Sequence, residues 1–328
     1  MKRKKTRQIR VGDVAIGGGA PVSVQSMTNT DTREVASTVA QIKHLEKAGC
    51  EIVRLAVPDE EAAESFRKIK DRVHIPLIAD IHFDHRLAIA ALRAGADGLR
   101  INPGNIGSRK AVEEVVREAQ ARRVPIRVGV NAGSLHRDIL AKYGHPTPEA
   151  MVESALRHVQ LLENLGFQEM KISLKSSNVQ ATIRAYELLS TQVDYPLHLG
   201  VTEAGTLVAW EILRALDLRA RGPEIISCPT CGRCEIDLFR LVERVEKGLE
   251  DITASPKVAI MGCIVNGPGE AREADVGVAG GRGQGILFRK GELVRKIPES
   301  DLADILISEV QKTVKQEIIQ GDRPKGEN

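Results

Sequence analysis

The first two thirds of the chain alternate short apolar runs with longer amphipathic stretches, and this alternation restricts the possible folds most. The apolar runs have the length of strands: Val22–Met27, Ile52–Val57, Leu77–Ile81, Gly98–Ile101, Ile126–Val130, Lys171–Leu174 and Leu197–Val201. The stretches between them repeat apolar residues with a helical period: Glu34–Ala48, Glu60–Lys70, His85–Ala94, Ser108–Arg122, Pro148–Leu165 and Thr182–Leu189. Strands that alternate strictly with helices predict a parallel sheet with right-handed crossovers.

Glycines divide these units sharply. Gly49, Gly95 and Gly166 each follow a predicted helix, and the next strand begins directly afterwards. Glycine ends a helix at little cost because it adopts the left-handed conformation. Units this short and regular favour a closed (β/α) barrel over an open doubly wound sheet, which remains the alternative. A full barrel has eight strands and this chain offers seven, so we expect an α/β, TIM-type barrel that lacks one βα unit.

The pattern changes near Pro223, where a smaller unit is expected to begin. A helix is predicted at Ile236–Leu249, a strand at Val258–Met261, a hairpin at Ile286–Arg289 and Leu293–Ile297, and a last helix from Ser300 to about residue 319. The glycine-rich segment 277–285 lacks the Gly-Lys-Ser/Thr of a phosphate-binding loop and is interpreted as a flexible turn. We therefore expect a barrel domain at 1–222 and an α+β domain at 223–328.

Charge and composition exclude several classes of function. Lys and Arg number 47 against 44 Asp and Glu, and aromatic residues make up only 3%. This near balance and the lack of stacking side chains argue against a nucleic-acid-binding protein. The basic N-terminus is not followed by an apolar segment, and no run approaches the roughly 18 apolar residues of a membrane span. The sequence thus predicts a cytoplasmic protein without a nucleic-acid or membrane partner.

The cysteines give the strongest chemical signal. Cys228 and Cys231 form a C-x-x-C pair, and Cys263 returns at the end of a predicted strand. Thiolates that converge from separate elements suit an iron–sulfur cluster or a zinc site. Zinc would recruit Cys234 as a fourth ligand, whereas a cluster could take a carboxylate, for which Glu270 is available. The fifth cysteine, Cys50, lies in an apolar context and is expected in the core.

A second signal lies at the carboxyl ends of the predicted barrel strands. Charged and polar residues gather there: Arg54, Asp80, His82, Arg100, Asn102, Arg127, Asn131, Lys171, Lys175 and Glu203. This end of a barrel is where such folds bind substrates. Several cations around one mouth suit a multiply anionic ligand such as a diphosphate. Asp80, His82 and Glu203 are then candidates for proton transfer.

Several motifs together resemble one known family, the 4-hydroxy-3-methylbut-2-enyl diphosphate synthases. The resemblance rests on segments spread almost end to end: Lys5–Gly12, Val24–Thr28, Gly49–Arg54, Ile78–His82, Arg100–Asn105, Gly200–Gly205, Ser227–Arg233 and Gly262–Glu270. It implies an iron–sulfur oxidoreductase of the non-mevalonate isoprenoid pathway. Such an enzyme opens 2-C-methyl-D-erythritol 2,4-cyclodiphosphate reductively and expels water, with electrons from ferredoxin or flavodoxin.

The resemblance also implies roles for individual residues. A 4Fe-4S cluster would be bound by Cys228, Cys231, Cys263 and Glu270 in the C-terminal domain. The barrel would bind substrate through Arg54, Arg100, Arg127, Asn131, Lys175 and Glu203, with Glu203 donating a proton to the leaving hydroxyl. The family resemblance further implies a homodimer in which the cluster of one subunit covers the barrel of the other.

The chain departs from the family pattern at two places. Cys234 stands where relatives usually carry a non-ligand such as Thr. After Gly205 the chain runs directly into what looks like the eighth helix, so that a helix and a strand of the relatives have no counterpart. That strand supplies a phosphate-binding Ser in relatives, and its loss predicts weak turnover. The alternative to an active enzyme is thus a catalytically impaired cluster- or zinc-binding homologue.

Overall fold

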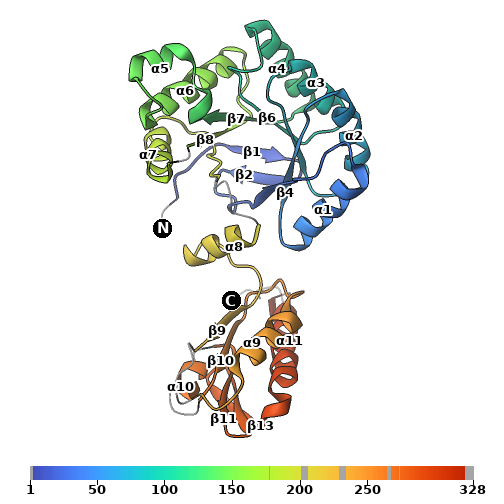
Figure 1. Cartoon of the computed structure of the whole chain (residues 1–328), viewed down its shortest axis with the longest axis vertical. Coiled ribbons are helices and arrows are strands. Elements are labelled where there is room, and N and C mark those ends of the chain that lie inside the picture. Colours follow the sequence, from blue (N-terminus) through green and yellow to red (C-terminus); the bar gives the residue numbers. More distant parts are fainter. Residues whose placement is uncertain are drawn as a thin grey trace, which may run out of the picture. The chain divides into compact units, whose positions relative to one another are not determined.

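The fold was analysed in a computed structural model of the chain, which describes residues 3–176, 178–200, 206–228, 234–263, 267–272 and 274–321. The chain forms two compact units, residues 1–219 and 220–328. Each is described by itself (Figure 1). None of the helices in the described part has the length and apolar character that a membrane crossing requires.

The first unit is built on a parallel sheet of six strands, ordered β3-β4-β5-β6-β7-β8. These strands are β3 Gln25–Met27, β4 Ile52–Ala56, β5 Leu77–Asp80, β6 Gly98–Ile101, β7 Ile126–Asn131 and β8 Met170–Lys175. The helices on the outer side of the curled sheet are α1 Val35–Lys47, α2 Glu60–Lys70, α3 His85–Arg93, α4 Arg109–Arg122, α5 Arg137–Tyr143, α6 Pro148–Asn164 and α7 Val179–Ser190. The predicted parallel α/β architecture is therefore present, in the form of a half-barrel.

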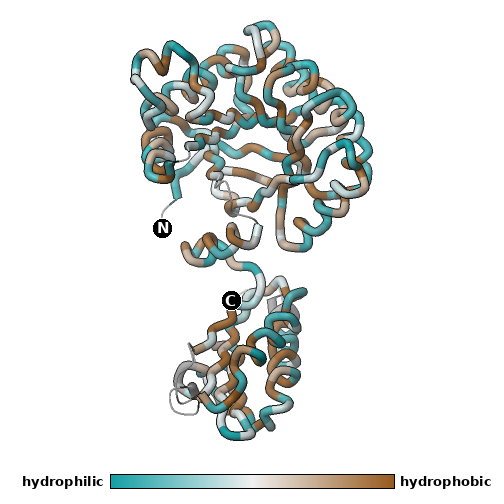
Figure 2. Tube along the Cα trace, viewed as in Figure 1, coloured by the Kyte–Doolittle hydropathy of each residue, from teal (hydrophilic) through white to brown (hydrophobic). Residues whose placement is uncertain are grey.

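Glycines and capping side chains determine where the helices begin and end. Gly49, Gly95 and Gly166 have φ values of 92°, 94° and 70°, so the predicted left-handed helix ends are confirmed. Ser108 and Thr147 cap the starts of α4 and α6 through their side-chain oxygens. Apolar residues follow the strands and the inward faces of the helices (Figure 2), and they form one continuous core around the sheet.

The expected seventh strand, Leu197–Val201, differs from the prediction. Within the described residues it consists of a single parallel bridge between Ile172 and Leu197, and residues 201–205 lie outside the description. The next element is α8, Thr206–Ala215, which packs at the other edge of the sheet. Trp210 and Leu213 pack on Val24 just before β3, and the Trp210 indole donates to the carbonyl of Gly49 at 3.2 Å.

The amino end of the sheet is closed by an N-terminal hairpin. It consists of β1, Gln8–Val11, and β2, Val14–Gly17, which pair in antiparallel register, as expected from the sequence. Val11 is fully buried and packs on Ile52 and Ile78. Because this end is sealed by apolar contacts, the opposite, carboxyl end is the one at which the interior can receive a ligand.

The second unit contains a five-stranded sheet of order β13-β12-β11-β10-β9. Its elements are β9 Glu224–Ser227, α9 Leu238–Leu249, β10 Lys257–Met261, α10 Gly267–Arg272, β11 Val276–Gly281, β12 Gln284–Arg289, β13 Glu292–Pro298 and α11 Leu302–Gly321. The predicted hairpin at Lys290-Gly291 is confirmed, with both residues at positive φ. A small α+β unit was thus predicted correctly.

The interpretation of the glycine-rich segment as a flexible turn is wrong for its first half. Residues Val276–Gly281 form β11, which is buried along its whole length between β10 and β12. The glycines are needed for packing. A Cβ on Gly277 would stand 2.7 Å from the carbonyl oxygen of Ala271, and one on Gly280 would stand 2.5 Å from Ile236.

We predict that α8 is held to the sheet mainly by Trp210, which is 5% exposed. Trp210→Ala removes the indole and leaves the Gly49 carbonyl without its donor, so the free energy of unfolding should fall by about 3–5 kcal/mol. Denaturant unfolding followed by circular dichroism measures this loss. Val208→Ala, at a position of the same helix that is 49% exposed, is the matched control and should change stability by less than about 0.5 kcal/mol. Equal effects of the two substitutions would contradict this account of α8.

Candidate functional site

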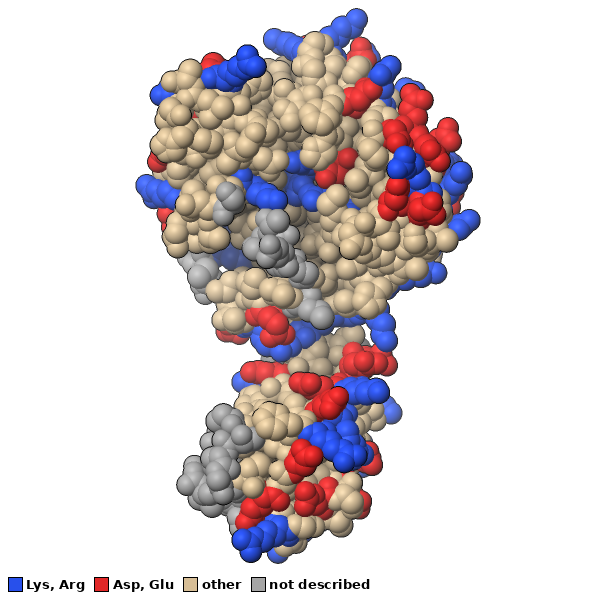
Figure 3. Space-filling model, viewed as in Figure 1, with Lys and Arg blue, Asp and Glu red and all other residues tan. Residues whose placement is uncertain are grey.

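Four charged side chains stand side by side inside the half-barrel. Asp80, Arg100, Arg127 and Lys171 occupy matching register positions on β5, β6, β7 and β8. Residues paired in parallel register project from the same face of a sheet, and all four are at least 93% buried. The interior therefore contains a row of three cations with one carboxylate at its end. Figure 3 shows Lys and Arg side chains gathered in a hollow of this unit.

Asp80 is the carboxylate that three basic neighbours surround, and Arg100 is the one that donates a hydrogen bond to it. The Arg100 guanidinium lies 3.1 Å from Asp80 Oδ1, and Arg54 Nε lies 3.5 Å from Oδ2. His82 Nε2 lies 3.7 Å from the same carboxylate and 3.0 Å from Arg100 Nη1. One carboxylate cannot neutralise two guanidinium groups, so this cluster retains net positive charge.

Arg54 has an unusual second partner. Its Nη2 and Nε lie 2.9 and 3.2 Å from the thioether sulfur of Met27 at the end of β3. A thioether is a weak acceptor and carries no charge. Burial, followed by the effect of neighbouring Arg100, lowers the pKa of Arg54 even though Asp80 opposes this change. Arg54 is thus held in place without being neutralised, and an anionic ligand would be its better partner.

Arg127 and Lys171 lack a carboxylate partner within the described residues. Arg127 Nε is buried without a hydrogen bond there, and Lys171 Nζ contacts the amide oxygen of Gln25 at 3.3 Å. Burial and the charges of Arg54 and Arg100 lower the pKa of Arg127 to about 9, which leaves it charged at neutral pH. Burial and then Arg127 and Arg54 lower the pKa of Lys171 to about 7. Uncompensated buried cations mark a site for an anion.

Gly129 leaves space for the side chain of Arg100. A Cβ on Gly129 of β7 would lie 2.8 Å from Arg100 Nε, so the guanidinium of Arg100 crosses β7 at the residue that has no side chain. Nε of Arg100 is also buried without a hydrogen-bond partner among the described residues. Two arginines that each leave Nε unsatisfied in one buried row are suited to binding phosphate oxygens.

Three further predicted residues, Asn102, Asn131 and Lys175, lie at or just after the ends of their strands. Asn102 is buried, accepts from the amide of Gly104 at 3.1 Å and lies 3.4 Å from the Ser134 hydroxyl, so it shapes the loop after β6. Asn131 and Lys175 are paired in register at the ends of β7 and β8, where Lys175 is exposed. Glu203 lies outside the described residues, as does Cys231.

The sequence predicted Arg127 and Lys171 at the carboxyl ends of their strands, and this placement is wrong. Each is the second residue of its strand, β7 or β8, and is at most 4% exposed, whereas Asn131 and Lys175 are the last residues of these strands. Met27 and Gln25, which contact Arg54 and Lys171, were not singled out at all. Their signal is the period of two along β3, which puts both on the same face of the strand.

A second candidate site lies in the smaller unit, where two parallel strands end at the same level. Ser227 of β9 pairs with Ile260 of β10, so Cys228 and Gly262 follow the two strand ends side by side. The Gly262 amide donates to Cys228 Sγ at 3.4 Å. The Glu235 amide donates to the Gly262 carbonyl at 2.9 Å and brings Cys234 back to the same place.

Gly262 makes room for the sulfur atoms. A Cβ at this position would stand 2.5 Å from Cys234 Sγ and 3.6 Å from Cys228 Sγ. Cys263 follows directly, and the described cysteines form no disulfide. Within the described residues no three side chains of Cys, His, Asp or Glu come together as a metal-ligand group, and Cys231 lies outside them. The side chain of Glu270, in α10, is not described. The cysteines, the amide donor to sulfur and the side-chain-free Gly262 fit a metal–sulfur site.

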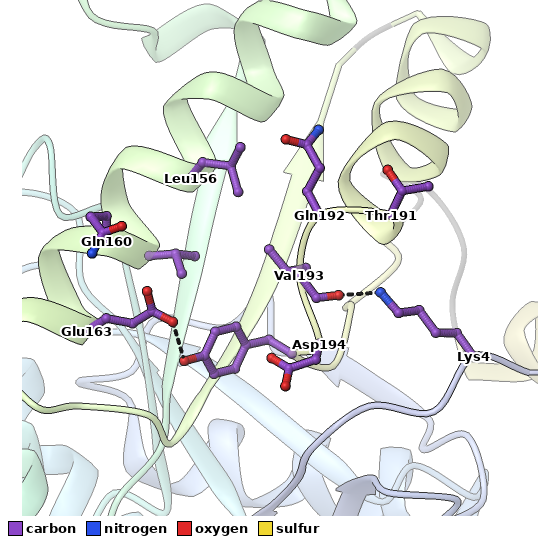
Figure 4. A pocket seen from close by; sticks show the side chains of 10 residues that line it. Lys4, Leu156, Gln160, Glu163, Thr191, Gln192, Val193 and Asp194 are labelled. Atoms are coloured by element: carbon purple, nitrogen blue, oxygen red, sulfur yellow. Dashed lines mark hydrogen bonds between the residues drawn. The ribbon is translucent and has the colours of Figure 1, made fainter.

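A groove of about 650 Å³ on the outside of the first unit is a separate feature (Figure 4). It lies between α6 and the segment after α7, which precedes the bridge at Leu197. Its polar groups already have partners: the Tyr195 hydroxyl donates to Glu163 at 2.8 Å and the Lys4 ammonium donates to the carbonyl of Val193. This groove lies toward the amino ends of the strands and does not include the cation row.

Comparison with known proteins identifies relatives over nearly the whole chain. The family model of the GcpE TIM-barrel domain matches residues 6–219, and that of the GcpE protein C-terminal domain matches residues 224–312. A protein of Geobacter sulfurreducens is 57% identical over 346 aligned positions, which cover 94% of this chain and 98% of the relative. One of Nitratidesulfovibrio vulgaris is 58% identical, with 90% and 86% covered. Both are 4-hydroxy-3-methylbut-2-en-1-yl diphosphate synthases (flavodoxin).

We predict that the buried row lowers the stability of the fold. Because the pKa of Lys171 is lowered from 10.5 to about 7, the unfolded chain binds the proton more tightly, and the penalty is complete below pH 7 and fades as the pH rises toward 10.5. Lys171→Met should therefore stabilise the protein by on the order of a few kcal/mol at pH 6 and by much less at pH 10.

Denaturant titration at the two pH values measures this difference. Lys175→Met, at the exposed end of the same strand, is the matched control and should leave stability nearly unchanged at both. A Lys171→Met variant that is less stable than the parent at pH 6 would show that the lysine is not a buried, uncompensated charge.

Proposed function

Because this chain belongs to the GcpE family, we propose that it reduces 2-C-methyl-D-erythritol 2,4-cyclodiphosphate to 4-hydroxy-3-methylbut-2-enyl diphosphate with electrons from flavodoxin. It is an oxidoreductase of isoprenoid biosynthesis, as its relatives are. The observation in the structure that carries this assignment is the buried row of Arg100, Arg127 and Lys171, with Asp80 as its only carboxylate among the described residues. No comparison favours the alternative of an impaired or zinc-binding homologue, and we do not retain it.

In the proposed reaction the cyclic diphosphate binds at the carboxyl end of the half-barrel. Arg54, Arg100 and Arg127 bind the phosphate oxygens, and Asn131 and Lys175 at the strand ends complete the site. Asp80 orients Arg100 and Arg54 through the contacts already described. Because the guanidinium groups are fixed before the ligand arrives, little entropy is lost when they bind it. Asn102 holds the loop after β6 that borders the site.

The proposed chemistry breaks the carbon–oxygen bond to the ring phosphate and expels one hydroxyl as water, consuming two electrons and two protons. Glu203 is proposed to protonate the leaving hydroxyl, and His82, whose side chain is half exposed beside Asp80, exchanges protons with solvent. A 4Fe-4S cluster, when bound, supplies the electrons. Cys228, Cys231, Cys263 and Glu270 are proposed to hold it, and Gly262 leaves room for the sulfur of Cys228 at the strand ends.

We propose a different function for each of the two units. We assign substrate binding to residues 1–222 and cluster binding to residues 223–328. The reaction needs both sites on one substrate, and a head-to-tail homodimer, as the family resemblance implies, would provide them in a closed symmetric pair. A reducing, cytoplasmic setting is proposed because the proposed cluster requires its cysteines as thiolates.

We also propose that one βα unit of the barrel is absent from this chain. Two observations support this. α8 packs directly beside β3, where the last helix of a barrel belongs. The alignment with the Geobacter relative runs over 346 positions, although this chain has 328 residues and 94% of them are covered. The absent unit would lie between the bridge at Leu197 and the free edge of β3.

Metal analysis and an activity assay test the proposed function. After anaerobic purification we expect about four irons per chain and turnover of the cyclic diphosphate with reduced flavodoxin. Cys263→Ser should lower the iron content and abolish turnover, whereas Cys50→Ser, at a buried position of the other unit, should leave the iron content unchanged. One zinc per chain with no turnover would refute the assignment.

The proposed absence of one βα unit predicts that adding this unit back stabilises the protein. Inserting the corresponding helix and strand of the Geobacter relative after Gly205 should raise the thermal midpoint, because the new strand pairs the open edges of the sheet. Calorimetry of both chains measures this. An insertion of equal length made of Gly and Ser is the control. If the relative's segment raises the midpoint no more than the control does, the half-barrel has no vacant strand position.

A further inference from the structure

His198 lies at the open edge of the parallel sheet in the first unit, beside β8. It follows Leu197, which forms the parallel bridge to Ile172 of β8. The amide of His198 donates to the carbonyl of Ile172 at 2.8 Å. The main chain of His198 is therefore held next to β8 in the manner of a strand.

A tyrosine of α7 fixes this segment from the helix side of the sheet. The Tyr186 hydroxyl donates to the carbonyl of His198 and accepts from the amide of Leu174 in β8 at 2.9 Å. Tyr186 is buried, and this burial raises its pKa to about 12, so the hydroxyl keeps its proton at neutral pH. One hydroxyl thus joins residue 198 to β8 and gives it a defined position.

The side chain of His198 is directed into the half-barrel. Leu197 and Ile172 pack in the core between the sheet and its helices. Successive residues of an extended chain point to opposite faces, so the residues that follow these two, His198 and Ser173, lie on the inner face. Lys171, two residues before Ser173, projects from the same face. His198 therefore belongs to the interior that contains the buried row of cations.

Two small residues leave space in front of His198. Ser173 stands beside it, and Gly129 of β7 pairs with Ser173. The Ser173 hydroxyl lies 3.5 Å from the carbonyl of Val128, against the sheet. The guanidinium of Arg100 crosses β7 at Gly129 and so reaches the same level from the other side. A ligand on these small residues would lie between Arg100 and His198.

The imidazole of His198 is neutral at physiological pH. Although part of the residue is still exposed, burial of the ring lowers its pKa well below the usual 6.5. The charges of Arg127, Lys171 and Arg54, on β7, β8 and β4, act in the same direction. A neutral imidazole keeps one N–H donor and one acceptor nitrogen. Among the described residues none hydrogen-bonds to this ring.

We propose that His198 is a further substrate-binding residue, whose imidazole donates a hydrogen bond to an oxygen of the diphosphate at the level of Arg100. The identity of the ligand rests on the proposed function. A neutral donor suits this position because it adds a directed hydrogen bond without adding another positive charge to the buried row. His198 would bind the ligand from the edge of the sheet that the arginines do not reach.

Calorimetric titration of inorganic pyrophosphate and of the cyclic diphosphate into the oxidised, anaerobically purified chain tests the proposal. His198→Leu removes the N–H and should weaken the binding of both ligands about ten- to hundredfold. His198→Gln retains an N–H donor of similar reach and should recover most of this loss. His74→Leu, at an exposed histidine before β5, is the matched control and should leave both dissociation constants unchanged.

A second measurement follows the imidazole itself, in chain labelled with carbon-13 at histidine Cε1. The resonance of His198 is identified by its absence from His198→Gln. Without ligand it should stay in place between pH 6 and pH 8, because the ring is neutral throughout this range, and it should shift when pyrophosphate binds. A resonance that titrates near pH 6.5 in the free chain, or that pyrophosphate leaves in place, overturns the proposal. If His198→Leu does not fold, this resonance decides.

Failure of this inference can be told from failure of the proposed function. If the parent chain binds both ligands and folded His198→Leu binds them equally well, His198 does not contact the diphosphate, and only this inference is overturned. If the parent chain binds neither ligand, the cation row is not a diphosphate site and both proposals fall.

Discussion

The electrostatic arrangement around Asp80 is the constraint on which the first unit depends. One buried carboxylate faces Arg54 and Arg100, and two further cations, Arg127 and Lys171, continue the row without a carboxylate of their own within the described part of the chain. Buried charges of one sign destabilise a fold. The surrounding apolar core, which runs continuously around the sheet, offsets this cost. The half-barrel thus encloses positive charge that its described residues do not balance.

In the second unit the requirement is to bring cysteine sulfur atoms together, and a glycine again provides the space. Its sulfur atoms converge because two parallel strands, β9 and β10, end at one level and Gly262 occupies the point of closest approach. Glycines also let α10 approach β11 closely, at Gly277. In both units a residue without a side chain, Gly129 in one and Gly262 in the other, makes the space that a functional side chain fills.

Much of this could be predicted because it depends on local pattern. The strand Gly98–Ile101 and the helix Glu60–Lys70 agree with the prediction at both ends, since glycine, apolar period and capping residues act over a few positions. Register is not local, so Lys171 was predicted at the end of β8 although it lies four residues before that end. The burial of Val276–Gly281 was missed because glycines that signal turns also permit close packing. The position of Asp80 beside both Arg54 and Arg100 depends on three strands at once.

Calorimetric titration of the cyclic diphosphate into the oxidised, anaerobically purified chain, without an electron donor, tests the central claim most directly. The account predicts binding of one ligand per chain, weakened about ten- to hundredfold by Arg127→Met, since a hydrogen bond to a charged group contributes roughly 1.5–3 kcal/mol. Arg109→Met, on the exposed face of α4, should leave the dissociation constant unchanged. Equal affinity of the parent chain and Arg127→Met would show that the buried cation row is not the diphosphate site.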